Sequence, residues 1–120
     1  MLTSNDVIGD VVRQAVTLLP RVVAVVERCR TESDPRQDLA RACGTLIDEY
    51  GRLRDRLADL TTTSLIERID AMLYLEQRVV DEAAHLAFQP RSDRWARVAR
   101  SFGDGLTSSA DELLALAAQY

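Results

Sequence analysis

Apolar residues repeat with the period of an α-helix through most of the chain, most clearly between residues 35 and 60. In that segment the apolar positions are separated by alternating steps of four and three. This is the spacing of one helical face and of the a and d positions of a coiled coil. We call this row the seam, and it consists of Leu39, Cys43, Leu46, Tyr50, Leu53, Leu57 and Leu60. The pattern predicts an amphipathic helix at the centre of the fold.

Capping signals give the ends of this helix and of three others. Asp34 before Pro35 is typical of a helix start, and three consecutive threonines follow the last seam residue. A capping box of Ser64 with Glu67 begins the next helix, and Pro90 ends it. Together these signals predict four helices, at about residues 5–31, 35–60, 64–88 and 92–119.

Two of the predicted helices contain residues that usually interrupt a helix. Pro20 lies in the middle of the first helix, and Gly103 and Gly105 lie in the middle of the last. The apolar phase continues across both places. We therefore expect a kink at Pro20 rather than a break, and one continuous helix across the glycines rather than two short ones.

Four helices joined by short loops predict an all-α fold, an antiparallel up-down-up-down four-helix bundle that forms a single domain over residues 1–120. The seam has apolar flanks at first, but its later flanks are charged. These later flanking residues are Glu49, Arg54 and Arg56. The narrower second half of the seam is therefore expected to leave room for a partner chain.

Composition and charge disfavour several classes of partner. Apolar residues make up 47% of the chain and aromatic residues 5%, which predicts an aliphatic core and excludes a disordered chain. There are 19 acidic and 15 basic residues, and all 15 are arginine. A net charge of −4 without a basic run disfavours nucleic-acid binding and attachment to a membrane surface. Motifs for phosphate or dinucleotide binding are absent, and no cofactor is expected.

The two cysteines, Cys29 and Cys43, both fall on apolar faces. If the first two helices form a hairpin, counting residues from the turn places the cysteines at different levels. Disulfide geometry does not tolerate such an offset. We therefore expect buried, reduced thiols in a cytoplasmic protein. The lack of a secretory leader pattern and of a long apolar run favours the same compartment.

The helix predicted at 64–88 places one acid in its apolar face. On a helical wheel Glu76 falls in the middle of that face. A buried carboxylate needs a partner or must take up a proton. The candidate partners are Arg54, Arg56 and Arg97.

The opposite side of the same helix carries a second line with helical spacing. We call it the outer face, and it consists of Tyr74, Arg78, Asp81, His85 and Phe88. Two aromatic residues and the only histidine on an outward line are typical of an interaction surface. The sequence therefore predicts a non-enzymatic protein-interaction module, a scaffold or regulatory adaptor that binds a second copy of itself.

One alternative is enzymatic and depends on the spacing between Arg78 and His85. Six residues separate them, which resembles the Arg-x(4–6)-His signature of HEPN-family ribonucleases, themselves helical bundles. The resemblance implies metal-independent RNA cleavage, with both side chains assisting attack of a 2′-hydroxyl. Val79 follows the arginine where that family prefers a polar residue.

Two further interpretations also use His85. With Glu82 it forms an E-x-x-H pair similar to those of ferritin-like di-iron bundles. A symmetric dimer would combine two such half-sites, with Glu49 as an additional ligand. An outward histidine on a four-helix bundle also resembles histidine phosphotransfer domains. Those domains follow the histidine with Lys-Gly, whereas here Leu86 and Ala87 follow it.

Overall fold

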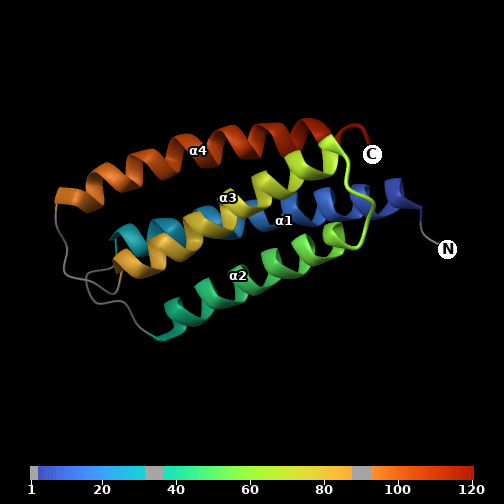
Figure 1. The fold of residues 1–120 in the computed structure, drawn as a ribbon. Coiled ribbons are helices and arrows are strands. Elements are labelled where there is room, and N and C mark those ends of the chain that lie inside the picture. Colours follow the sequence, from blue (N-terminus) through green and yellow to red (C-terminus); the bar gives the residue numbers. More distant parts are fainter. Residues whose placement is uncertain (1–2, 32–36, 88–92) are drawn as a thin grey trace.

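The chain forms four long helices in a computed structural model that describes residues 3–31, 37–87 and 93–120, with backbone only at 86 and 93–104. The helices are α1 (Ser4–Thr31), α2 (Gln37–Ala58), α3 (Ser64–Ala87) and α4 (Asp93–Ala117). The prediction of an all-α fold with four helices is confirmed, and every helix end lies within two residues of its expected position. Figure 1 shows successive helices running in opposite directions, so both termini lie at one end.

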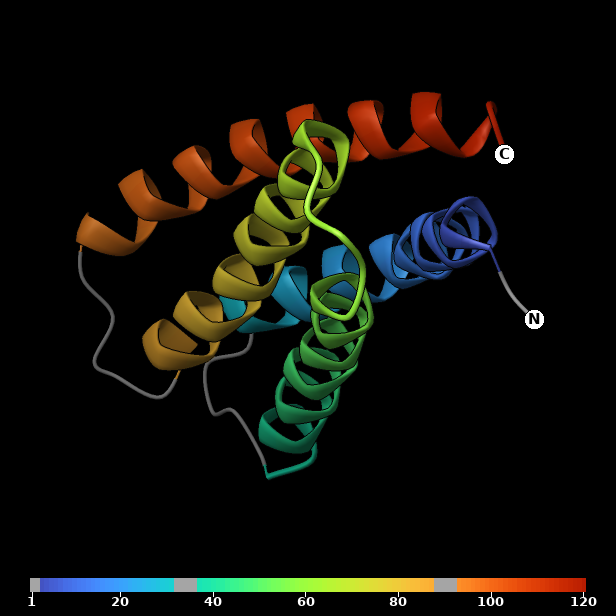
Figure 2. The ribbon, with the colours of Figure 1, turned by 45° about the vertical axis from the view of Figure 1, so that its right-hand side comes forward.

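The helices pack around a central pair. α1 and α3 contact each other, and each also contacts both α2 and α4. Within the described ranges α2 and α4 do not touch, and Figure 2 shows them on opposite sides of the central pair. The bundle is elongated, with extents of 49 × 25 × 21 Å. α3 is therefore the helix whose two sides border both outer helices.

The seam on α2 is buried along its whole helical length by its own chain. Leu53 is 4% exposed and Leu57 only 1%, so the expectation that the second half leaves room for a partner is wrong. The charged residues that flank the seam explain why the prediction fails, because their side chains extend to the neighbouring helices. Arg54 pairs with Asp70 on α3 at 2.9 Å, and Arg56 pairs with Asp10 on α1 at 2.7 Å. Both arginine side chains are only about one-third exposed, so they lie partly buried at the edges of the helix interfaces.

Both helices with potential interruptions are continuous. Pro20 lies inside α1 at an exposed position, and the helix continues on both sides of it. α4 runs through Gly103 and Gly105 without a break, so the prediction of one helix there is confirmed. The predicted start at residues 34–35 and stop at Pro90 lie outside the described residues.

Hydrogen bonds at the helix starts correct one capping prediction. At α1, the backbone N–H of Thr3 donates to Asp6 at 3.0 Å and that of Asp6 donates to the Thr3 hydroxyl at 3.1 Å, a complete capping box. At α3 the cap is Thr63 rather than Ser64, because its hydroxyl accepts the N–H of Ile66 at 3.3 Å. Ser64 is the first residue inside the helix.

The two cysteines lie next to each other in the core. Each is 1% exposed and neither is in a disulfide, but their Sγ atoms are only 4.0 Å apart. The prediction that they lie at different levels is therefore wrong. α1 and α2 pack with a register shift, so residues at unequal distances from the connection come level. The spacing within one helix carries no information about that shift.

Candidate functional site

The outer face of α3 is exposed at each of its four described positions; Phe88 lies outside the described residues. Tyr74 is 45% exposed and the His85 side chain is 70% exposed. Leu75, beside Tyr74, is also exposed and approaches Gly105 of α4. Near these residues the surface between α3 and α4 is hollowed into a mainly apolar groove of about 430 Å³. An exposed aromatic ring thus borders an apolar groove.

Two arginines hold the Tyr74 ring in place. The guanidinium of Arg54 lies 4.8 Å from the ring centre, and that of Arg78 lies 5.9 Å away, both within the range of cation–π attraction. Arg54 is itself fixed from two sides, since it donates to Asp70 at 2.9 Å and to Gln77 at 3.1 Å. The hydrogen bond to Asp70 raises the pKa of Arg54, which therefore keeps its charge. The ring is anchored across the α2–α3 boundary, which sequence spacing on α3 alone did not reveal.

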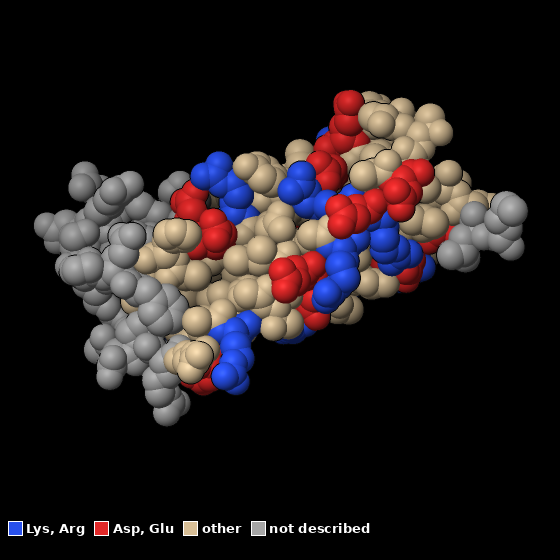
Figure 3. All heavy atoms as spheres, turned by 60° about the horizontal axis from the view of Figure 1, so that its bottom comes forward, with Lys and Arg blue, Asp and Glu red and all other residues tan. Residues whose placement is uncertain are grey.

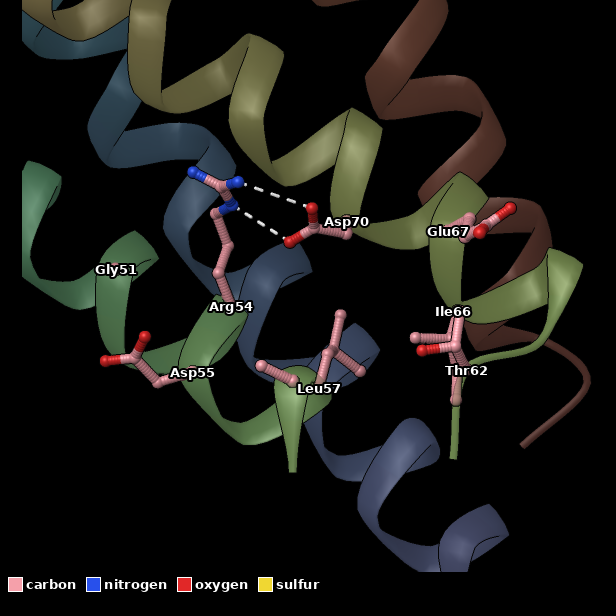
Figure 4. Close-up of a pocket in the computed structure, with 9 residues that line it drawn as sticks. Gly51, Arg54, Asp55, Leu57, Thr62, Ile66, Glu67 and Asp70 are labelled. Carbon is pink, nitrogen blue, oxygen red and sulfur yellow. Dashed lines mark hydrogen bonds and ion pairs between the residues drawn. The ribbon is translucent and has the colours of Figure 1, made fainter. Parts of the chain in front are cut away.

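The same ion pair borders a pocket of about 370 Å³ at the α2–α3 turn. Figure 4 shows the Arg54 guanidinium joined to Asp70 by two contacts, with Leu57 and Ile66 as apolar lining. The carboxylate of Glu67 points away from this pair. Because Asp70 neutralises the guanidinium, the arginine is not available to an anionic ligand in this pocket.

The two residues of the ribonuclease hypothesis are each engaged with a neighbour on α3. Arg78 forms an ion pair with Glu82, and the hydrogen bond that Arg78 donates to that carboxylate raises the pKa of Arg78. His85 Nδ1 lies 3.1 Å from the main-chain oxygen of Asp81 and 3.8 Å from its carboxylate. Two helical turns place Arg78 and His85 roughly 10 Å apart along the axis. They share a face without converging on one point.

The three candidate metal ligands do not come together within one chain. Glu49 pairs with Arg21 of α1 at 2.7 Å, whereas Glu82 and His85 belong to the outer side of α3. No group of three or more potential ligands is present among the described side chains. Within the described part of the chain, Glu49, Glu82 and His85 therefore do not form a metal site.

Glu76 is fully buried, at 0% exposure, where the helical wheel places it. The predicted cation partners do not serve it: Arg54 pairs with Asp70 and Arg56 with Asp10, while the Arg97 side chain lies outside the described residues. The neighbours of the carboxylate are two hydroxyl groups, those of Tyr50 on α2 and Ser109 on α4. We call these three residues the polar core cluster.

The polar core cluster carries unsatisfied groups. Both carboxylate oxygens of Glu76 and the hydroxyl of Tyr50 lack a hydrogen bond of normal geometry to any described residue. Burial raises the pKa of Glu76 to about 7, although the nearby Ser109 and Tyr50 hydroxyls oppose the shift. Burial and the Glu76 charge both raise the pKa of Tyr50. With this pKa, the Glu76 carboxyl group changes between its protonated and its charged form near neutral pH, although it lies in the core.

Surface charge around α2 is mixed in sign. Figure 3 shows blue and red side chains interspersed on this face, with uncharged surface between them. Arg21 and Arg28 pair here with the acids Glu49 and Asp38. This face does not present the clustered positive charge that phosphate backbones require. In the described part of the chain, no helix has the length and apolar character needed to cross a bilayer.

Comparisons of the chain with protein-family models, with curated proteins and with solved structures found no match.

Proposed function

We propose that this protein is a cytoplasmic interaction module that binds a second copy of itself through the outer face of α3. The observation that carries the proposal is the exposed Tyr74 ring between Arg54 and Arg78. Tyrosine and arginine are enriched at the centres of protein interfaces, where an aromatic ring that is already ordered loses little entropy on binding. In a two-fold dimer, the same surface would serve on both subunits.

The apolar groove beside Tyr74 supports this choice of surface. Leu75 is exposed at its edge, and Ala71 and Val79 lie along its length. Arg78 and Glu82 border the same groove and carry opposite charges. A self-complementary contact can therefore join apolar lining at the centre with alternating charges at the rim.

The ribonuclease alternative is the rival from another functional class, and it makes a different prediction. Its two side chains would have to leave Glu82 and Asp81 to contact RNA. Purified protein that cleaves RNA, and loses this activity in a folded His85→Ala variant, would establish the ribonuclease and remove the basis for a purely structural module.

The direct test is the molar mass in solution as a function of concentration. We expect the wild type to be dimeric and the Tyr74→Asp variant to be monomeric with an unchanged circular dichroism spectrum. The introduced carboxylate lies next to Arg54 and Arg78, so the fold should tolerate it. Tyr120→Asp is a matched control, because Tyr120 is similarly exposed (42%) but lies in the segment that follows α4, away from the outer face.

Two outcomes would contradict the proposal. A wild type that stays monomeric at every concentration up to the submillimolar range excludes self-association as the function of this face. A dimer that survives Tyr74→Asp but dissociates with Tyr120→Asp moves the interface to the C-terminal end of the bundle.

A further inference from the structure

We propose that Cys29 and Cys43 are an oxidation site at which a small hydroperoxide forms a reversible disulfide between α1 and α2. The two cysteines lie in the core and take no part in the proposed dimer contact, although Asp81 and His85 of the outer face border the groove beside Cys43. The inference rests on the distance between the two sulfur atoms and on a groove that leads to one of them.

The sulfur atoms already make direct contact. Their separation of 4.0 Å fits a hydrogen bond between a thiol and a second sulfur, with either atom as donor. A disulfide requires about 2.05 Å, so the atoms must approach by roughly 2 Å. This change would have to come from side-chain rotation at both residues and a small adjustment of the two packed helices.

A groove of about 440 Å³ between α2 and α3 gives access to Cys43. Cys43 lines it together with small and apolar residues, and Asp81 and His85 stand at the α3 side. Beside the cysteine, an added side-chain carbon at Gly44 would meet no atom within 4 Å. The groove is therefore open next to Cys43, and because the residue is only 1% exposed, a small opening of the core must complete the path to its sulfur. Hydrogen peroxide is small and uncharged enough to use this path, whereas a peptide thiol or disulfide is not.

The surroundings distinguish the roles of the two sulfurs. The hydrogen bond from Cys29 lowers the pKa of the Cys43 thiol more than burial raises it, and the charge of Arg28 lowers it further. A thiolate is the nucleophile in such reactions. Because Cys43 also lines the groove and Cys29 does not, Cys43 is the sulfur that attacks the peroxide, and Cys29 is the resolving thiol.

The reaction balances with the peroxide as the only oxidant. The Cys43 thiolate attacks one peroxide oxygen, an S–O bond forms, the O–O bond breaks, and the leaving hydroxide takes a proton to become water. Cys29 sulfur then attacks Cys43 sulfur, so that the S–S bond forms and the S–O bond breaks. The second hydroxide leaves as water with the Cys29 proton. Two thiols lose two electrons in total, and the peroxide is reduced to two water molecules.

The consequence is a covalent link near one end of the bundle. The disulfide closes the chain between residues 29 and 43 and thereby restricts the unfolded state. Oxidation should raise the thermal unfolding midpoint of the wild type. The midpoints of Cys29→Ala and Cys43→Ala should not rise on the same treatment.

The test uses the native full chain, hydrogen peroxide and a free-thiol assay under denaturing conditions. We expect both thiols to be lost together, the intact mass to fall by two hydrogens, and a non-reducing digest to contain the Cys29–Cys43 cross-linked peptide. Dithiothreitol should restore both thiols. In Cys29→Ser, whose hydroxyl can still donate a hydrogen bond to Cys43, Cys43 should react with a sulfenic-acid probe, whereas Cys29 in Cys43→Ser should react much more slowly.

A pair of glycine variants tests the access route. Gly44→Leu fills open space beside Cys43 and should slow peroxide oxidation several-fold. Gly51→Leu, on the same helix but near the α2–α3 turn, should leave the rate unchanged. The proposal is overturned if native protein keeps both thiols under peroxide that oxidises N-acetylcysteine, or if the disulfide forms between chains.

Discussion

On its inner face α3 carries Glu76 into an aliphatic core, with hydroxyl groups beside it in place of a cation in the described structure. On its outer face Arg78 pairs with Glu82, and the carboxylate of Asp81 lies 3.8 Å from the His85 ring, both in contact with water. α3 therefore carries a buried acid without a described cationic partner on its inner face, and charged side chains that contact water on its outer face. Burial makes the first arrangement costly, whereas solvent makes the second nearly neutral. This contrast predicts that the inner face controls stability and leaves the outer face free for binding.

The largest effect should come from a pair of leucines on these two faces. Leu73 is 0% exposed, whereas Leu75 is 38% exposed. Leu73→Ala should lower the free energy of unfolding by about 2–5 kcal/mol, because it leaves a cavity in the core. Leu75→Ala should lower it by less than about 1 kcal/mol. Urea denaturation measures both, and similar losses for the two variants would contradict the division of α3 into two faces.

The second prediction concerns the charge of Glu76. Its pKa rises from an ordinary value of 4.5 to about 7 in the folded protein. Below pH 4.5 both the folded and the unfolded chain hold the proton. Between pH 4.5 and 7 the unfolded chain loses it while the folded chain keeps it, so stability falls as pH rises. Above pH 7 both states have lost the proton, and the free energy of unfolding is then about 3 kcal/mol lower than below pH 4.5.

The neutral Glu76→Gln variant should remove this pH dependence. We expect its free energy of unfolding to be similar at pH 5 and pH 8 and to exceed that of the wild type at pH 8. The hydroxyls of Tyr50 and Ser109, which face the carboxyl group from α2 and α4, keep their protons over this range. Glu67→Gln, at an exposed position on α3, is the control and should retain the wild-type slope. A wild type equally stable at both pH values would show that Glu76 is solvated or paired.

The two faces of α3 also show what a single sequence can predict. The alternating steps of the seam and the position of Glu76 follow from periodicity within one helix, and that period is fully visible in the sequence. The hydroxyl partners of Glu76 and the contact of Cys29 with Cys43 depend on the register between helices. Register is set by side-chain packing in three dimensions, so no spacing within one helix predicts it.

Arg54 illustrates the same limit at the surface. The sequence indicated Tyr74 as an exposed aromatic residue, but not that an arginine 20 positions earlier lies against its ring at 4.8 Å. The charged flank of the seam predicted that the second half of that helix leaves room for a partner chain. In the structure it closes the seam and supports the outer face of α3 instead.

The smallest effects on the free energy of unfolding should come from two arginines at the surface, Arg54 and Arg68. Arg54→Met removes hydrogen bonds to Asp70 and Gln77 and the contact with the Tyr74 ring. Because the pair is partly exposed, we expect a loss of only about 1 kcal/mol. Arg68→Met breaks a more exposed ion pair with Glu112 and should change stability by less than about 0.5 kcal/mol.

The two substitutions should differ more in their effect on dimer affinity than in their effect on the free energy of unfolding. Without Arg54 the Tyr74 ring loses one of its two cationic neighbours and regains side-chain freedom, which self-association must then overcome. Arg54→Met should therefore weaken the dimer measured by sedimentation, while Arg68→Met leaves it intact. Equal dimer affinity in both variants would mean that the ordered ring contributes nothing to binding, and the outer face would lose the feature that singles it out.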